Sequence, residues 1–316
     1  MKELPIGVHV FAGDTPGLAA GIVAADGAGL DVAWVTLGPN APDPFVVYTQ
    51  AAAQAQRIQF GTSIVTTFPR HPLAMAQSAM ALDQVAPGRL RLGVGPSHKP
   101  LVEGFYGIPF ERPLAHLREY LTILNAILKE GTVSFQGELL QAEASFGGPT
   151  QVSVLASALR PKAFRLCGEL TEGAISWMCP LPYIRDVAGP ALEEGARIAG
   201  RPKPAMIVHA PVVLSEDAEA VRAAAKRQFG FYQRMPYYSQ MLQEAGYPEA
   251  AGEEFSDAMS DGLVISGSEA AVGDRIRALP QYGVDELLAT IVLVGDTPQA
   301  TADRTLAFLG ELAREA

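Results

Sequence analysis

The stretch Gly88–His98, GRLRLGVGPSH, decides how the rest of the chain is interpreted. Its apolar residues at positions 90, 92 and 94 alternate with Arg91 and Gly93, so they share one face of an extended strand. The strand ends in a glycine turn, where many α/β proteins bind a cofactor phosphate. The nearest motif is the dinucleotide fingerprint G-x-G-x-x-G, but His98 stands where the third glycine is required. The stretch therefore predicts a strand and turn without that fingerprint.

Short β-rich runs and alanine-rich helical stretches alternate along most of the chain. Strands that alternate with helices of this length indicate βαβ units and parallel pairing. The chain of 316 residues suits one (β/α)8 TIM barrel, which takes about 250 residues plus insertions. A doubly wound open sheet is the rival fold, but GVHVFAGDTPG, at the first strand, lacks its glycine spacing. The eight expected strands are Ile6–Phe11, Asp31–Val35, Phe60–Val65, Leu90–Val94, Val152–Leu155, Gly173–Ser176, Met206–Leu214 and Glu286–Val294.

We predict a single α/β domain over residues 1–316, a (β/α)8 barrel with insertions at about 131–149 and 229–262. The first insertion contains a sequence typical of a β-hairpin, TVSFQGELLQ, and the second is rich in tyrosine, glutamine and methionine. The sequence shows no internal repeat, low-complexity linker or clean domain boundary.

Composition excludes several classes of function. Hydrophobic residues make up 48% of the chain and charged residues 18%, which favours a large buried core. The net charge of -10 lacks the basic footprint of nucleic-acid-binding proteins. Two distant cysteines make neither a metal motif nor a disulfide framework, and no apolar run approaches the roughly 18 residues of a membrane span. The N-terminus lacks the pattern of a signal peptide, so we expect a cytoplasmic protein that binds neither membrane nor nucleic acid.

The active site of a (β/α)8 barrel lies at the carboxyl ends of its strands, which makes some histidines candidates for chemistry. His9 and His209 lie in apolar strands, where a buried core role and a functional role are equally plausible. His98 follows the fourth strand in a loop, and this position favours function. His71 precedes a helix and is expected to be structural, whereas His116 is expected to face solvent from its helix.

The chain lacks the motifs that supply catalysis by themselves. It has no H-x-x-x-H pair or cysteine cluster for a metal, no G-x-S-x-G elbow and no Walker loop. Barrels of this kind often take their chemistry from a cofactor, while the protein supplies position and electrostatics. We therefore expect a cofactor-dependent site without a metal.

A series of short motifs in order resembles the bacterial luciferase-like monooxygenase superfamily. The motifs are FGTSIVT (60–66), RHPLA (70–74), GRLRLGVG (88–95), FERP (110–113), EYL (119–121), GS (267–268) and YGVDELL (282–288). They span nearly the whole chain, and their order is more specific than any one of them. The resemblance implies a (β/α)8 oxidoreductase that uses a flavin or a deazaflavin. The chain is most similar to the branch that uses coenzyme F420, a deazaflavin that carries hydride.

The resemblance also implies where the cofactor would lie. The third strand of these proteins ends in a non-proline cis peptide behind the ring, and the matching bond is Ser63–Ile64. The phosphate is held after the fifth strand at a helix N-terminus, where free N–H groups favour an anion. Relatives often have glycines in that turn, whereas this chain has Leu159 and Arg160. Arg70 and Lys99 are further basic candidates for the polyglutamate tail of F420. The expected cofactor-binding residues are Ser63, Ile64, Thr66, Gly95, Pro96, Ser97, Ser157, Ala158, Leu159, Arg160, Lys162 and Trp177.

Two departures from the family pattern affect catalysis. Several relatives have an acidic residue and a histidine just after the second strand, where this chain has Leu37 and Gly38. A catalytic glutamate after the fourth strand is replaced by His98. The sugar-phosphate dehydrogenase mechanism therefore does not carry over. Because an imidazole titrates near neutral pH, His98 is the first candidate acid or base and His9 the second.

Three functions stay open. The first is an F420-dependent oxidoreductase that moves a hydride between the cofactor ring and a small organic substrate. The second is an FMN-dependent monooxygenase that takes reduced flavin and oxygen, and the third is a barrel that binds a cofactor without catalysis. Relatives are often dimers, so a homodimer is expected. The expected walls of the substrate pocket are Phe11, Tyr106, Trp177 and the aromatic residues of the second insertion, Phe231, Tyr232, Tyr237 and Tyr238.

Overall fold

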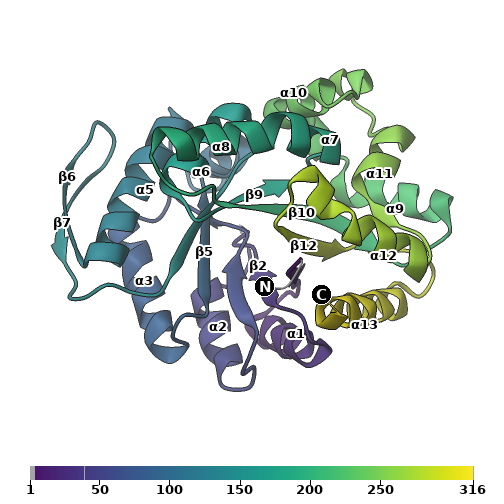
Figure 1. Ribbon diagram of the computed structural model, residues 1–316, viewed down its shortest axis with the longest axis horizontal. Coiled ribbons are helices and arrows are strands. Elements are labelled where there is room, and N and C mark those ends of the chain that lie inside the picture. The colour runs from purple at the N-terminus through teal and green to yellow at the C-terminus, as the bar shows by residue number, and fades with distance from the viewer. Residues whose placement is uncertain (1–3, 39, 316) are drawn as a thin grey trace.

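The computed structural model describes residues 4–38 and 40–315, and within them eight parallel strands close into a barrel surrounded by helices (Figure 1). The strands follow one another around the barrel in chain order, and the last pairs with the first, with Ile6 opposite Leu287. The predicted (β/α)8 fold is therefore confirmed. The barrel strands are β1 (Ile6–His9), β2 (Val32–Val35), β3 (Gln59–Thr62), β5 (Leu90–Gly95), β8 (Ser153–Ser157), β9 (Gly173–Trp177), β10 (Ala205–Val213) and β12 (Glu286–Ile291).

The observed strands differ from the expected ones at their ends. β1 stops at His9 instead of Phe11: its ladder with β2 ends at the pair His9–Trp34, and Phe11 beyond it is 88% exposed. The third expected strand is divided by the cis peptide Ser63–Ile64, after which the short β4 (Val65–Thr66) pairs with β5. This cis bond confirms the one that the family resemblance implied. A second short strand, β11 (Ile265–Ser266), pairs with β10.

Helices cover the outside of the barrel, and side chains or prolines begin several of them. Asp14 accepts a hydrogen bond from the Gly17 amide at 2.7 Å and caps the first helix. The covering helices are α1 (Thr15–Ala28), α2 (Pro44–Ala52), α3 (Pro72–Val85), α5 (Pro113–Glu130), α6 (Pro161–Leu170), α8 (Gly189–Ile198), α9 (Ala218–Phe229), α12 (Glu269–Arg277) and α13 (Pro298–Glu315). Shorter helices are α4 (Lys99–Gly104), α7 (Leu181–Tyr183), α10 (Pro236–Glu244) and α11 (Asp257–Leu263), with single turns at Ile184–Ala188, Tyr232–Arg234, Pro248–Ala251 and Leu279–Tyr282.

The hairpin expected in the first insertion is present. β6 (Thr132–Gln136) and β7 (Gln141–Ser145) form an antiparallel ladder that stands out from the barrel beside α5 (Figure 1). The Glu119 carboxylate on α5 accepts hydrogen bonds from the amides of Glu138, Leu139 and Leu140 at 3.0, 2.9 and 2.7 Å. This one side chain therefore ties the hairpin turn to the barrel. The second predicted insertion contains α10 and α11.

Trp34 fills the middle of the barrel. A Cβ at Gly7 would lie 2.4 Å from its indole nitrogen, and a Cβ at Gly61 would lie 2.3 Å from its ring. Below it, Arg91 and Glu286 form a buried ion pair at 2.6 Å, with the guanidinium 5.0 Å from the Trp34 ring centroid. Side chains therefore fill the barrel at the amino-terminal ends of the strands. A site is expected at the opposite, carboxyl-terminal end.

Two histidines outside this end have structural surroundings. His71 accepts a hydrogen bond from the Leu73 amide and caps α3, as expected. The solvent-facing position expected for His116 is wrong, because its side chain is buried and stacks on Phe68 with the centroids 4.1 Å apart. His116 and Tyr120 are four residues apart and share the inward face of α5. No helix in the described part of the chain is long and apolar enough to cross a membrane.

Candidate active site

A cavity of about 1030 Å³ opens at the carboxyl ends of the barrel strands. Its floor consists of side chains that point into the barrel from seven strands or the residues directly after them. Its walls come from the loops after β5 and β8, the first turns of α5, and the segment that follows β10. The floor residues are His9, Thr36, Ser63, Ile64, Ser157, Trp177, His209 and Thr290.

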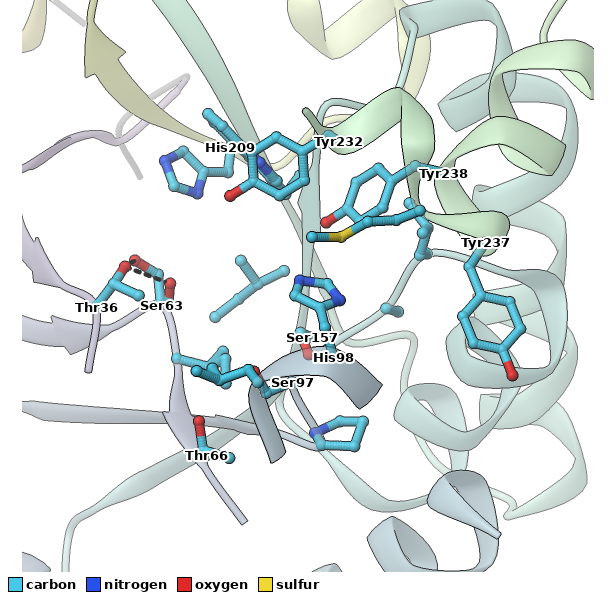
Figure 2. Close-up of a pocket in the computed structure, with 18 of the residues that line it drawn as sticks. Thr36, Ser63, Thr66, Ser97, His98, Ser157, His209, Tyr232, Tyr237 and Tyr238 are labelled. Carbon is cyan, nitrogen blue, oxygen red and sulfur yellow. Dashed lines mark hydrogen bonds between the residues drawn. The ribbon is translucent and has the colours of Figure 1, made fainter. Parts of the chain in front are cut away.

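One side of the floor is a chain of hydrogen bonds between neighbouring strands. Nε2 of His9 lies 3.1 Å from Oγ1 of Thr36, and this hydroxyl donates to the backbone carbonyl of Ser63 at 2.6 Å. The Ser63 hydroxyl also lies 3.4 Å from Thr36 (Figure 2). The three residues come from the ends of β1, β2 and β3, so the barrel register brings them together.

The other side of the floor contains a second histidine. His209 contacts Thr290 through Nε2 and Oγ1 at 2.6 Å, and its ring lies 4.1 Å from Trp177 and 5.6 Å from His9 between centroids. Burial lowers the pKa of His9 to about 4. Burial, and then the charge that His9 would carry, lower the pKa of His209 well below its usual value. Both imidazoles are therefore neutral at physiological pH.

His98 lies above this floor, at the N-cap of α4. Figure 2 shows it between Ser97 on one side and the tyrosines on the other, and its ring centroid is 5.8 Å from that of Tyr238 and 6.3 Å from that of Tyr232. Burial lowers its pKa as well. Its side chain makes no capping hydrogen bond to α4 and lines the cavity, where it can meet a bound molecule.

The residues expected to contact a cofactor ring lie along one wall. Ser63, Ile64, Thr66, Pro96 and Ser97 all line the cavity. Ser97 has a φ of 63°, a left-handed conformation that is uncommon outside glycine. Gly95 is buried beneath this wall, and a Cβ there would lie 2.1 Å from Oγ of Ser157. A side chain at that position would push into the floor, so the glycine keeps the wall open.

The turn expected to hold a phosphate ends at the N-terminus of α6. Arg160 is the N-cap, and no side chain caps the helix. Pro161 has no N–H, and the amides of Ala163 and Phe164 donate to the Arg160 carbonyl, so among the first helical residues the Lys162 amide remains available to an anion. Nη2 of Arg160 binds Glu244 at 2.6 Å, whereas its Nη1 is buried and has no partner among the described residues. The cavity reaches Ala158, Leu159, Arg160 and Lys162. An uncapped helix end beside an unpartnered guanidinium nitrogen fits a phosphate group.

Aromatic side chains of the second insertion cover the cavity. Tyr232 packs against Tyr238 and against Trp177, at 4.9 and 5.7 Å between centroids. Trp177 also meets Phe229 edge to face at 5.6 Å. The cavity lining within the described residues contains no aspartate or glutamate. No group of three or more metal-binding side chains occurs among those residues. The cavity is thus mainly apolar, with neutral polar groups on its floor and basic groups at one end.

The structure brings most of the residues chosen from the sequence together. His9 and His98 line the cavity, as do the expected cofactor residues apart from the buried Gly95, and so do the four aromatic residues of the second insertion. Phe11 and Tyr106 do not line it. Phe11 follows the end of β1 and is 88% exposed, and Tyr106 lies after α4 with its ring edge to face against Phe105. Arg70 pairs with Asp43, and Lys99 lies 3.8 Å from Glu103, so of the three basic candidates only Arg160 reaches the cavity.

Several lining residues escaped the sequence analysis. Thr290 lies two residues beyond the inward-facing Leu288, so the period of two could have identified it. Phe110 lies just before α5, and Leu114 and Leu117 lie in its first turns. These residues reach the cavity because this part of the chain lies over the end of the barrel, and no local pattern shows that.

Comparisons with known proteins show what the chain is similar to. The 5,10-methylenetetrahydromethanopterin reductase of Methanopyrus kandleri is 25% identical over 350 residues, covering 98% of both chains. The solved structure of the coenzyme F420-dependent tetrahydromethanopterin reductase from the same organism gives a TM-score of 0.78 at 22% identity over 98% of both chains. A type II Baeyer–Villiger monooxygenase in complex with FMN, the oxygenating constituent of 3,6-diketocamphane monooxygenase from Pseudomonas putida, gives 0.75 at 18% identity over 98% of this chain and 97% of that one.

The two solved structures share the fold of this chain from end to end. A family model described as luciferase-like monooxygenase matches residues 16–308, which is almost the whole barrel. The chain therefore belongs to the luciferase-like monooxygenase family and is an oxidoreductase of that family.

Proposed function

We propose that the protein is a coenzyme F420-dependent oxidoreductase that transfers a hydride between the cofactor ring and a small organic substrate. The observation that carries the proposal is the form of the cavity. A wall that includes Ser63 and Ile64 leads to the start of α6, where no side chain caps the helix and Nη1 of Arg160 has no partner among the described residues. Such a cavity fits a flat ring that continues into a phosphate. The similarity in sequence to a putative coenzyme F420-dependent oxidoreductase of Mycobacterium tuberculosis, 27% identical over 91% of this chain, supports the deazaflavin over FMN.

The chain's own residues have distinct parts in this proposal. Ser63, Ile64 and Thr66 would support the ring on one side, with the backbone of Pro96 and Ser97 at its edge. The turn 158–162 would bind the phosphate through amide groups and the Arg160 guanidinium. When bound, the cofactor would supply the hydride chemistry, so the protein needs no nucleophile of its own.

The remaining lining would bind and enclose the substrate. The rings of Trp177, Tyr232 and Tyr238 form an apolar wall that excludes water from the reacting atoms. His98 stands at this wall and is our first candidate to exchange a proton with the substrate, with His9 second. Burial lowers the pKa of both side chains, so each would meet the substrate as a neutral imidazole.

A competition titration tests the proposal. Purified protein is titrated with oxidised F420 while the cofactor fluorescence is followed, and FMN is then added as a competitor. We expect F420 to bind with micromolar or better affinity and FMN to displace it only in large excess. Tighter binding of FMN would favour the FMN-dependent monooxygenase instead. Binding of F420 without turnover on a panel of enones, imines and alcohols would favour a non-catalytic barrel. Binding of neither cofactor would refute all three functions.

We also propose a homodimer. The helices α2 and α3 present small side chains at Ala52 and Ala74, which allow close packing between copies. Light scattering on the purified protein would give the mass of a dimer, and a monomeric mass would contradict it.

A further inference from the structure

The hydrogen bonds on the cavity floor fix the position of one proton. The Ser63 carbonyl can only accept, and it lies 2.6 Å from the Thr36 hydroxyl, so the single proton of that hydroxyl is used in this bond. The Thr36 oxygen is then an acceptor towards His9, whose Nε2 lies 3.1 Å away. Nε2 of His9 must therefore carry the proton of that second bond.

This assignment leaves the other ring nitrogen of His9 without a proton. Burial lowers the pKa of the side chain to about 4, so at neutral pH the ring has one proton only, and Nε2 holds it. The hydrogen bond of the His9 side chain to a described residue is the one through Nε2, so Nδ1 has no partner among these residues, and His9 lines the cavity. The floor of the cavity thus presents a fixed hydrogen-bond acceptor to whatever binds there.

His209 provides a contrast within the same floor. Its Nε2 lies 2.6 Å from Thr290, but no carbonyl within the described chain takes the Thr290 proton. Either atom of that pair can donate, so the tautomer of His209 is not fixed in this way. The two histidines are near neighbours with similar surroundings, and only His9 has the arrangement that fixes its proton.

The surroundings select the kind of group that would donate to His9. An ammonium group would need a carboxylate to balance its charge when buried, and the described lining of the cavity has none. A neutral hydroxyl carries no such cost, and the aromatic wall formed with Trp177 and Tyr232 suits the apolar remainder of the molecule.

We propose that Nδ1 of His9 is a recognition site for a hydroxyl group on an otherwise apolar substrate, and that Thr36 is a positioning residue that fixes the His9 tautomer through the Ser63 carbonyl. This inference rests on the proposed function only in treating the cavity as the substrate site. The hydrogen-bond chain itself needs no cofactor.

Nitrogen NMR tests the tautomer directly. The chain has five histidines, so protein with ¹⁵N-labelled histidine gives five ring systems that single substitutions assign. We expect His9 in the wild-type protein to show a protonated Nε2 and an unprotonated Nδ1. T36V should lose this single tautomer, and T36S should restore it because the hydroxyl returns. T290V is the matched control, which should change the His209 signals and leave the His9 tautomer intact.

A matched pair of probes tests the recognition site. Addition of 1-phenylethanol to the cofactor-free protein should move the Nδ1 signal of His9, whereas its methyl ether, which has no proton to donate, should not. A protonated Nδ1 in the wild type, or a tautomer unchanged in a folded T36V, would overturn the role of Thr36. The absence of a response to the alcohol, or an equal response to the ether, would overturn the recognition site. A failure of F420 to bind would leave these spectra unaffected, so the two proposals fail separately.

Discussion

Arg160 offers the sharpest test of how a phosphorylated cofactor is held. The R160A substitution removes a guanidinium at the N-terminus of α6 whose buried Nη1 has no partner in the described part of the chain. A hydrogen bond to a charged group contributes about 1.5–3 kcal/mol to the free energy of binding. We take the lower half of this range, because the Arg160 side chain is 27% exposed and already pairs with Glu244. We therefore expect F420 to bind roughly 10- to 30-fold more weakly to R160A.

A residue on the same helix provides the control. Arg165 also forms an ion pair, with Glu194 at 2.7 Å, but it does not line the cavity. R165A removes the same charge from the same helix, so it should bind F420 as the wild type does. Affinity is measured by calorimetry at two salt concentrations, and thermal melts establish that both variants are folded. Equal affinity of R160A and R165A would refute the assignment of the phosphate to this turn.

Three further predictions concern the framework of the site. In G93A the new Cβ would lie 2.0 Å from the Thr62 carbonyl oxygen, so overpacking should reduce stability by about 1–3 kcal/mol in urea melts. G104A, which meets open space, should have much less effect, and equal losses would contradict the packing argument. Desolvation raises the pKa of the Glu119 carboxyl, but three amide hydrogen bonds outweigh it and lower the pKa, so hairpin stability is present above the unfolded pKa and is lost as pH falls. Amide exchange in the hairpin should therefore quicken in E119Q at neutral pH, and unchanged exchange would count against this anchor. Burial lowers the pKa of His9 from 6.5 to about 4, so its contribution to stability is present above pH 6.5 and is lost as pH falls towards about 4. In H9Q the free energy of unfolding should fall less steeply with pH over this range than in the wild type. The same dependence on pH in both proteins would show that His9 is not buried as described.

The sequence was sufficient to predict the barrel because its evidence is local. Each strand shows a run of apolar or β-branched residues, and each helix has its own start signal, such as Asp14 before α1. The ends of strands were less predictable, since pairing decides them. The expected first strand continues to Phe11, yet the ladder of β1 with β2 ends at the pair His9–Trp34, and Phe11 is exposed.

Contacts between distant segments could not be predicted in the same way. Trp34 fits between Gly7 and Gly61 only in the observed register of β1, β2 and β3. No local sequence pattern predicts this register. The pairing of His9 with Thr36 depends on the same register, which is why the sequence left His9 open between core and site. The burial of His116 could have been found, because it repeats with Tyr120 at helical spacing.

The cofactor that the protein takes up in a cell tests the central proposal most directly. The protein is produced in a host that makes both F420 and FMN, purified without added cofactor, and denatured, and the small molecule released is identified by its absorption spectrum and mass. The proposed ring wall at Ser63 and Ile64 and the proposed phosphate turn at Arg160 predict that the cofactor recovered is F420 and not FMN. Recovery of FMN alone, with F420 present in the same cells, would contradict the proposal.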